Sequence, residues 1–113
     1  MLDTKELSYG LRDLQREIHK TATDKGWWDN PREEGTLISL MHCELSEAVE
    51  GLRAGNPKDD KIPEYYSCEA ELADVIIRIF DFAEGKGHDV IGAMMEKVKM
   101  NKGREHMHGG KKF

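Results

Sequence analysis

Apolar residues recur every three or four positions along most of the chain, and no alternating, strand-like pattern stands out. This period gathers the apolar side chains of a segment on one helical face. We predict helices over about residues 4–23 and 31–54, a third that begins between 63 and 67 and ends near 85, and a fourth over 89–101. The expected fold class is all-α, a four-to-five-helix bundle.

The predicted second helix carries signals at both ends. Asn30 as N-cap, Pro31 at the first helical position and Glu33 three residues after the cap resemble a capping box. Gly55 suits the left-handed conformation that often follows the end of a helix. The segment from 56 to 67 combines prolines with charged residues and is expected to be a loop.

The predicted third helix is apolar on nearly all sides. One face carries Leu72, Val75, Ile76, Ile79, Phe82 and Ala83, and the other carries Ile77 and Phe80. Such a helix belongs in the centre of a bundle or at a subunit interface. The chain has 113 residues, enough for one domain with a modest core, so oligomerisation would add to its stability.

The composition narrows the class of protein. The chain contains no run of about 18 apolar residues and no basic segment followed by an apolar leader, so we expect a cytoplasmic protein without a membrane partner. The net charge of -5 argues against a nucleic-acid partner. Residues 97–113 carry six basic residues and one acidic residue, which leaves a charge of about -10 on residues 1–96. A basic, glycine-rich tail at 102–113 thus follows an acidic domain.

Two pairs of acidic residues share one helical spacing. Glu44 and Glu47 lie three residues apart on the second helix, and Glu71 and Asp74 repeat this spacing on the third. If the helices pack side by side, four carboxylates converge and repel one another, so a cation must compensate. Mg²⁺, or Mn²⁺ as a substitute, prefers such oxygen ligands. A di-iron site would instead need histidine at the second position of each pair.

The same acids also have a simpler interpretation. Any single pair can form a solvated helix face, or can be neutralised by a basic neighbour such as Arg78, four residues after Asp74. Two pairs beside apolar stripes, followed by a basic tail, favour the metal-site interpretation.

The motifs "ELSE" at 44–47 and "ELAD" at 71–74 resemble the acidic signature of the MazG-like all-α nucleoside triphosphate pyrophosphohydrolases. Further segments are similar in the same order, namely "GWW" at 26–28, "LISLMHCELSEAVEGLR" at 37–53, "ELADVIIRIFD" at 71–81 and "NKGREHMHGGKK" at 101–112. The resemblance covers nearly the whole chain, as one compact domain over 1–113. One position departs from it, because Cys43 stands where many members have a further glutamate.

The resemblance implies an activity and a set of site residues. The activity is Mg²⁺-dependent hydrolysis of a nucleoside triphosphate to the monophosphate and pyrophosphate, by a homodimer or homotetramer. The implied metal ligands are Glu44, Glu47, Glu71 and Asp74, and a carboxylate of this set, Glu47 or Glu44, would orient or deprotonate the attacking water. Lys97, Asn101 and Arg104 would hold the phosphates. Trp27 or Trp28 would stack on the base, unless the pair closes the core or a subunit contact. Apart from the resemblance, His42 is a candidate to contact the base or a structural residue on the helix flank.

Two alternatives remain open at this point. The chain can be a catalytically silent helical interaction protein whose carboxylates hold a structural Mg²⁺. It can also perform the same chemistry on an alarmone or a phosphoribosyl nucleotide, because base and sugar preference depend on pocket shape.

Overall fold

The computed structural model describes residues 2–103, and every regular element in this range is an α-helix. The helices are α1 (Thr4–Asp24), α2 (Glu34–Arg53), α3 (Ser67–Lys86) and α4 (Val90–Lys102). Residues 2–103 contain no β-strand, so the predicted all-α class is confirmed. The predicted basic tail lies outside the described residues from Arg104 onward.

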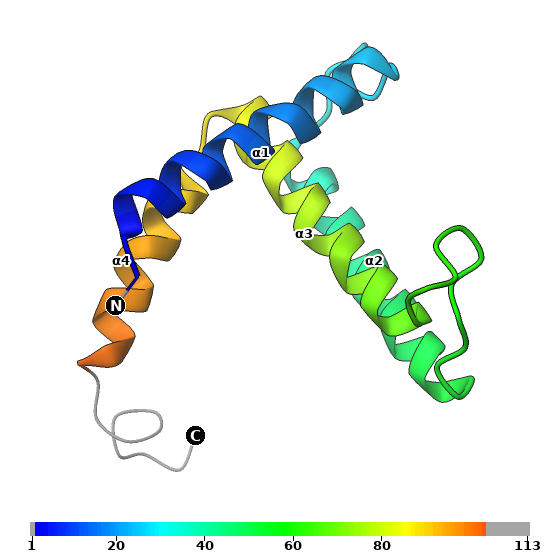
Figure 1. The fold of residues 1–113 in the computed structure, drawn as a ribbon. Helices are drawn as coiled ribbons and strands as arrows, with labels where there is room; N and C mark the ends of the chain where they lie inside the picture. The colour runs from blue at the N-terminus through cyan, green and yellow to red at the C-terminus, as the bar shows by residue number, and fades with distance from the viewer. Residues whose placement is uncertain (1, 104–113) are drawn as a thin grey trace.

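The helices form two arms of an open V (Figure 1). One arm holds α1 and α4, and the other holds α2 and α3, which run side by side. The arms join where α3 packs against α1. Within one chain the four helices therefore do not enclose a common centre, and the closed bundle stays a prediction for the assembled protein.

The second helix begins later than predicted. Helix α2 starts at Glu34, and Glu33 is an N-cap with extended backbone and no side-chain hydrogen bond, so the predicted capping box from Asn30 is wrong. The physical reason lies in α3, because the Lys86 ammonium donates a hydrogen bond of 2.9 Å to the Arg32 carbonyl. This contact holds residues 30–33 as a loop across the end of α3.

Two other helix boundaries follow local rules. Asp3 caps α1, since its carboxylate accepts hydrogen bonds from the backbone N–H groups of Lys5 and Glu6 at 3.1 and 3.2 Å. Gly55 has a φ of +88°, which confirms the left-handed position predicted after α2. The chain then crosses from α2 to α3 through residues 54–66 without a helix.

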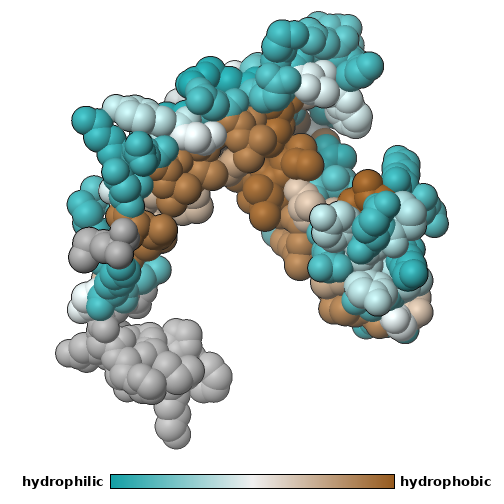
Figure 2. Space-filling model, in the orientation of Figure 1, coloured by the Kyte–Doolittle hydropathy of each residue, from teal (hydrophilic) through white to brown (hydrophobic). Residues whose placement is uncertain are grey.

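The core of the single chain is small. The buried apolar residues are Leu37, Ala48, Ala70, Val75, Phe80, Ala83 and Ile91. On α3, by contrast, Leu72, Ile76 and Ile77 are each more than 40% exposed. Figure 2 shows apolar surface along the inner side of the V. An exposed apolar surface of this extent is typical of an interface.

No helix within residues 2–103 combines the length and the apolar character needed to cross a membrane.

Candidate functional site

The packing of α2 on α3 brings three of the four predicted carboxylates together. One oxygen from each of Glu44, Glu47 and Glu71 lies within 4.8 Å of the others. Glu44 and Glu71 are half-buried between the helices, whereas Glu47 is exposed. The cluster thus opens to solvent on the side of Glu47.

The burial and crowding of these carboxyl groups change the pKa of Glu71. Desolvation, followed by hydrogen bonding to Glu47 and Glu44, raises the pKa of Glu71 to about 7. A carboxyl group with this pKa keeps its proton at mildly acidic pH. Because a metal ligand must be deprotonated, a bound cation would displace this proton.

Asp74 lies one turn beyond Glu71 and does not join the three-carboxylate cluster. Desolvation and then the charge of Glu44 raise the pKa of Asp74, and the Arg78 guanidinium opposes this shift. Asp74 is therefore within electrostatic range of the cluster, as a neighbour of its Glu44 side. The expected convergence of four carboxylates is found for three of them.

Arg78 neutralises a different acid from the one its sequence position suggested. Its Nε donates a hydrogen bond of 2.8 Å to Glu44 on the neighbouring helix, and the Glu44 side chain is only 13% exposed. Glu47 and Glu71 form no ion pair among residues 2–103. Part of the negative charge of the cluster is thus left without a protein cation.

The donor set suits a hard divalent cation such as Mg²⁺ in its chemistry. Carboxylate oxygens are the hard ligands that Mg²⁺ prefers, and two ligands of one ion at 2.1 Å each lie at most about 4.2 Å apart. The 4.8 Å limit on the Glu44, Glu47 and Glu71 oxygens is within a small side-chain adjustment of that value. These three residues would hold such an ion, whereas the Asp74 carboxylate is not among the oxygens that converge.

An open cavity of about 300 Å³ adjoins the Glu44 side of this cluster. It is lined by Ile18, Thr21, Ala22, Lys25, Trp27, Glu44, Asp74, Ile77, Arg78 and Asp81. Trp27 is 51% exposed, and the Arg78 guanidinium lies 5.7 Å from the centre of its ring. The cavity therefore combines acidic groups, an apolar wall and an accessible aromatic ring.

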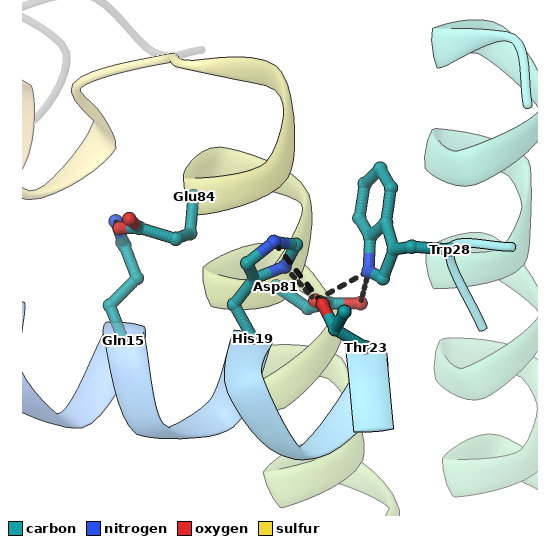
Figure 3. Close-up of polar contacts among 6 residues, drawn as sticks. All are labelled: Gln15, His19, Thr23, Trp28, Asp81 and Glu84. Atoms are coloured by element: carbon teal, nitrogen blue, oxygen red, sulfur yellow. Dashed lines mark hydrogen bonds and ion pairs between the residues drawn. The ribbon is translucent and has the colours of Figure 1, made fainter. Parts of the chain in front are cut away.

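Trp28, the neighbour of Trp27 in sequence, is instead fixed against α3 by hydrogen bonds and close packing. Its Nε1–H donates to both carboxylate oxygens of Asp81 at 2.9 and 3.1 Å, and His19 Nδ1 lies 2.8 Å from the same carboxylate (Figure 3). A Cβ atom at Gly85 would lie 2.4 Å from the Trp28 ring, so only glycine permits this close approach. Trp28 thus fixes the loop after α1 to α3.

Of the remaining predicted site residues, those that the structure describes belong neither to the carboxylate cluster nor to the lining of its cavity. Lys97 and Asn101 are exposed on α4, in the other arm of the V (Figure 1). Arg104 lies outside the described residues. His42 is exposed on α2 and does not line the cavity beside Glu44. Within one chain, the structure does not bring Lys97 or Asn101 to the carboxylates.

Sequence reasoning missed the part played by Asp81 and by the cross-helix pairing of Arg78. A signal was present, because Asp74, Arg78 and Asp81 lie four and then three residues apart and share one face of α3. A polar row of this kind on an otherwise apolar helix marks a face that lines a site. Asp81 anchors Trp28 and lines the cavity as well.

No family model, curated protein or solved structure matches this chain. The resemblance to the MazG-like enzymes stays a prediction from the motifs.

Proposed function

We propose that this protein is a Mg²⁺-dependent hydrolase that converts a nucleoside triphosphate to the monophosphate and pyrophosphate. The observation that supports this most directly is the cluster of Glu44, Glu47 and Glu71 beside an open cavity with an exposed tryptophan wall. Carboxylates can bind the metal ion that contacts the phosphates, and an accessible aromatic ring can stack on the base. The two requirements of a nucleotide site thus occur side by side.

Each residue has a defined task in this proposal. Mg²⁺, when bound, supplies charge neutralisation to the carboxylates and to the phosphates. Glu47 is the exposed member of the cluster, so it can orient the attacking water and accept its proton. Arg78 holds Glu44 in place through the hydrogen bond of 2.8 Å. The remaining catalytic requirement is in-line positioning of the water and the α-phosphorus.

Trp27 is the base-binding residue in this proposal, because its ring is exposed in the cavity while the Trp28 ring is occupied by Asp81 and Gly85. The Arg78 and Arg32 guanidinium groups lie 5.7 and 6.0 Å from the centre of the Trp27 ring, so a stacked base would share this ring with them. The cavity of about 300 Å³ is at the lower end of the range of about 300–1,000 Å³ for small-molecule sites.

A panel of nucleotides tests the proposed function. We expect pyrophosphate release in the presence of Mg²⁺ from at least one deoxynucleoside or ribonucleoside triphosphate, and none with excess chelator. The panel should include an alarmone and a phosphoribosyl nucleotide, since release from these alone would change the substrate class. If no compound releases pyrophosphate from metal-replete protein, the enzymatic proposal is wrong and the silent interaction protein is favoured.

We also propose that copies of the chain assemble into a homodimer or homotetramer. The chain exposes large apolar residues on all four helices of the V, including Leu14 on α1, Leu45 on α2, Ile76 on α3 and Val98 on α4. A second copy that packs against the inner side of the V would bury this surface. Its α4, which carries Lys97 and Asn101, would then be available to a site on the partner.

Light scattering with a matched pair of variants checks the assembly. The native chain should have at least twice the monomer mass at micromolar concentration. Ile76→Arg should shift it toward the monomer, because a charge cannot be buried unpaired in an interface. Ile62→Arg is the control, since Ile62 is similarly exposed but lies in the loop between α2 and α3. A native monomer, or equal behaviour of both variants, would contradict the proposed interface.

A further inference from the structure

A second cavity, of about 270 Å³, lies beside the same tryptophan, Trp27. It is lined by Lys25, Gly26, Trp27, Asn30 and Arg32, all from the loop between α1 and α2. Lys25 and Trp27 line both cavities, so the two adjoin one another. Lys97 and Asn101, the predicted phosphate-binding residues within 2–103, take no part in this second cavity.

The charge of the second cavity is opposite to that of the first. Its two ionisable lining residues, Lys25 and Arg32, are both cationic. Neither forms an ion pair among residues 2–103, whereas Arg78 in the first cavity is bonded to Glu44. The Asp29 carboxylate of the same loop lies beside Gly26 and forms no ion pair with Lys25 or Arg32. The positive charge of this cavity is thus available to a ligand.

The loop that carries these cations is well anchored. The Lys25 and Trp27 backbone N–H groups donate to the last carbonyls of α1, from Thr21 and Ala22, at 3.0 Å each. At the other end, the Arg32 carbonyl accepts the hydrogen bond from Lys86. The Arg32 guanidinium also lies 6.0 Å from the centre of the Trp27 ring. A cationic cavity on an anchored loop is pre-organised, which lowers the entropic cost of binding.

We infer that Lys25 and Arg32 form an anion-binding subsite that takes a phosphate or pyrophosphate group. Assigning that group to the nucleotide that occupies the neighbouring cavity rests on the proposed function; the existence of the subsite does not. Arg and Lys are the side chains that bind phosphate through charge-assisted hydrogen bonds, and the Asn30 amide adds a neutral donor. The subsite supplies from the same chain the cations that α4 does not bring to the site.

Calorimetric titration of inorganic pyrophosphate in metal-free buffer tests the subsite without the carboxylate cluster. Wild-type protein should bind at millimolar concentration or below. Lys25→Gln and Arg32→Gln should each weaken binding about tenfold, as expected for the loss of one hydrogen bond to a charged group. The double variant Lys5→Gln/Arg16→Gln is the matched control for the double variant Lys25→Gln/Arg32→Gln, because Lys5 and Arg16 are exposed on α1 outside the loop. This control should bind within about twofold of wild type.

The outcomes separate the subsite from the proposed function. If no nucleotide is hydrolysed but pyrophosphate affinity falls only in the loop variants, the subsite holds and the enzymatic proposal fails. If nucleotides are hydrolysed while the loop variants keep wild-type KM and pyrophosphate affinity, the subsite is wrong. Absence of pyrophosphate binding to wild-type protein, or an equal loss in the control, also overturns it. Circular dichroism of Lys25→Gln, an exposed position, checks that the fold is intact.

Discussion

Glu71→Gln should reduce pyrophosphate release by at least about 100-fold, because residues that merely support metal ligands already change affinity or activity 10- to 100-fold. Glu71 shares the cluster with Glu44 and Glu47, and an amide cannot replace a carboxylate charge at a divalent cation. The measurement is single-turnover pyrophosphate release at saturating Mg²⁺. Glu17→Gln is the matched control, since Glu17 is exposed on α1 and should keep wild-type activity.

The same variant should be more stable than wild type at alkaline pH without metal. The pKa of Glu71 is raised from 4.5 to about 7 in the folded protein, so the folded state binds more protons than the unfolded state between these values. The free energy of unfolding of metal-free wild type therefore falls as pH rises from about 4.5 to about 7. Glu71→Gln has no proton to lose at this position, and it also relieves the repulsion from Glu44 and Glu47.

Thermal unfolding at pH 5 and pH 8, with and without Mg²⁺, measures this difference. Mg²⁺ should stabilise wild type at pH 8 and have little effect on Glu71→Gln, because only the wild-type cluster binds it tightly. An inactive variant that is also less stable than wild type at pH 8 would indicate a structural role for Glu71. Retained activity would remove Glu71 from the site altogether.

The helices were predictable because periodicity is a local property of the sequence. All four predicted segments are helical, and Gly55 has the predicted conformation. The start of α2 was not predictable, because the contact that delays it comes from Lys86, 54 residues after Arg32 in the chain. The capping signals at Asn30 and Pro31 depend only on neighbouring residues in sequence, so they do not reveal a hydrogen bond from another helix.

The site was predictable only in part, for a related physical reason. Spacing of three residues places Glu44 beside Glu47 and Glu71 beside Asp74, but it does not define how far α2 is shifted along α3. The actual packing sets Glu71, and not Asp74, opposite the acids of α2. The packing also pairs Arg78 with Glu44 on the other helix, although Asp74 lies four residues before Arg78 on α3 itself. Which charges meet between helices is decided by packing.

The two adjacent tryptophans cannot be told apart from the sequence, but they differ in packing. Their truncation to alanine should therefore have opposite effects on stability and on substrate binding. Trp28→Ala should destabilise the protein by about 3 kcal/mol, the lower end of the range for large aromatic residues, because Trp28 is half-buried. It would leave Asp81 without its indole donor and leave a void beside Gly85. Trp27→Ala should change stability by less than about 1 kcal/mol, since the side chain is 51% exposed.

The effect on substrate binding should be reversed. Trp27→Ala should raise KM about tenfold with little change in kcat, because base stacking contributes about 1–3 kcal/mol and each 1.4 kcal/mol is a factor of ten. Urea unfolding and steady-state kinetics on the two variants, with Trp28→Phe as a milder third, separate the roles. Trp28→Phe keeps an aromatic ring but not the N–H that Asp81 accepts, so its stability should lie between those of wild type and Trp28→Ala. If Trp27→Ala unfolds as readily as Trp28→Ala while KM is unchanged, then Trp27 closes the core, and the base must be recognised elsewhere in the cavity.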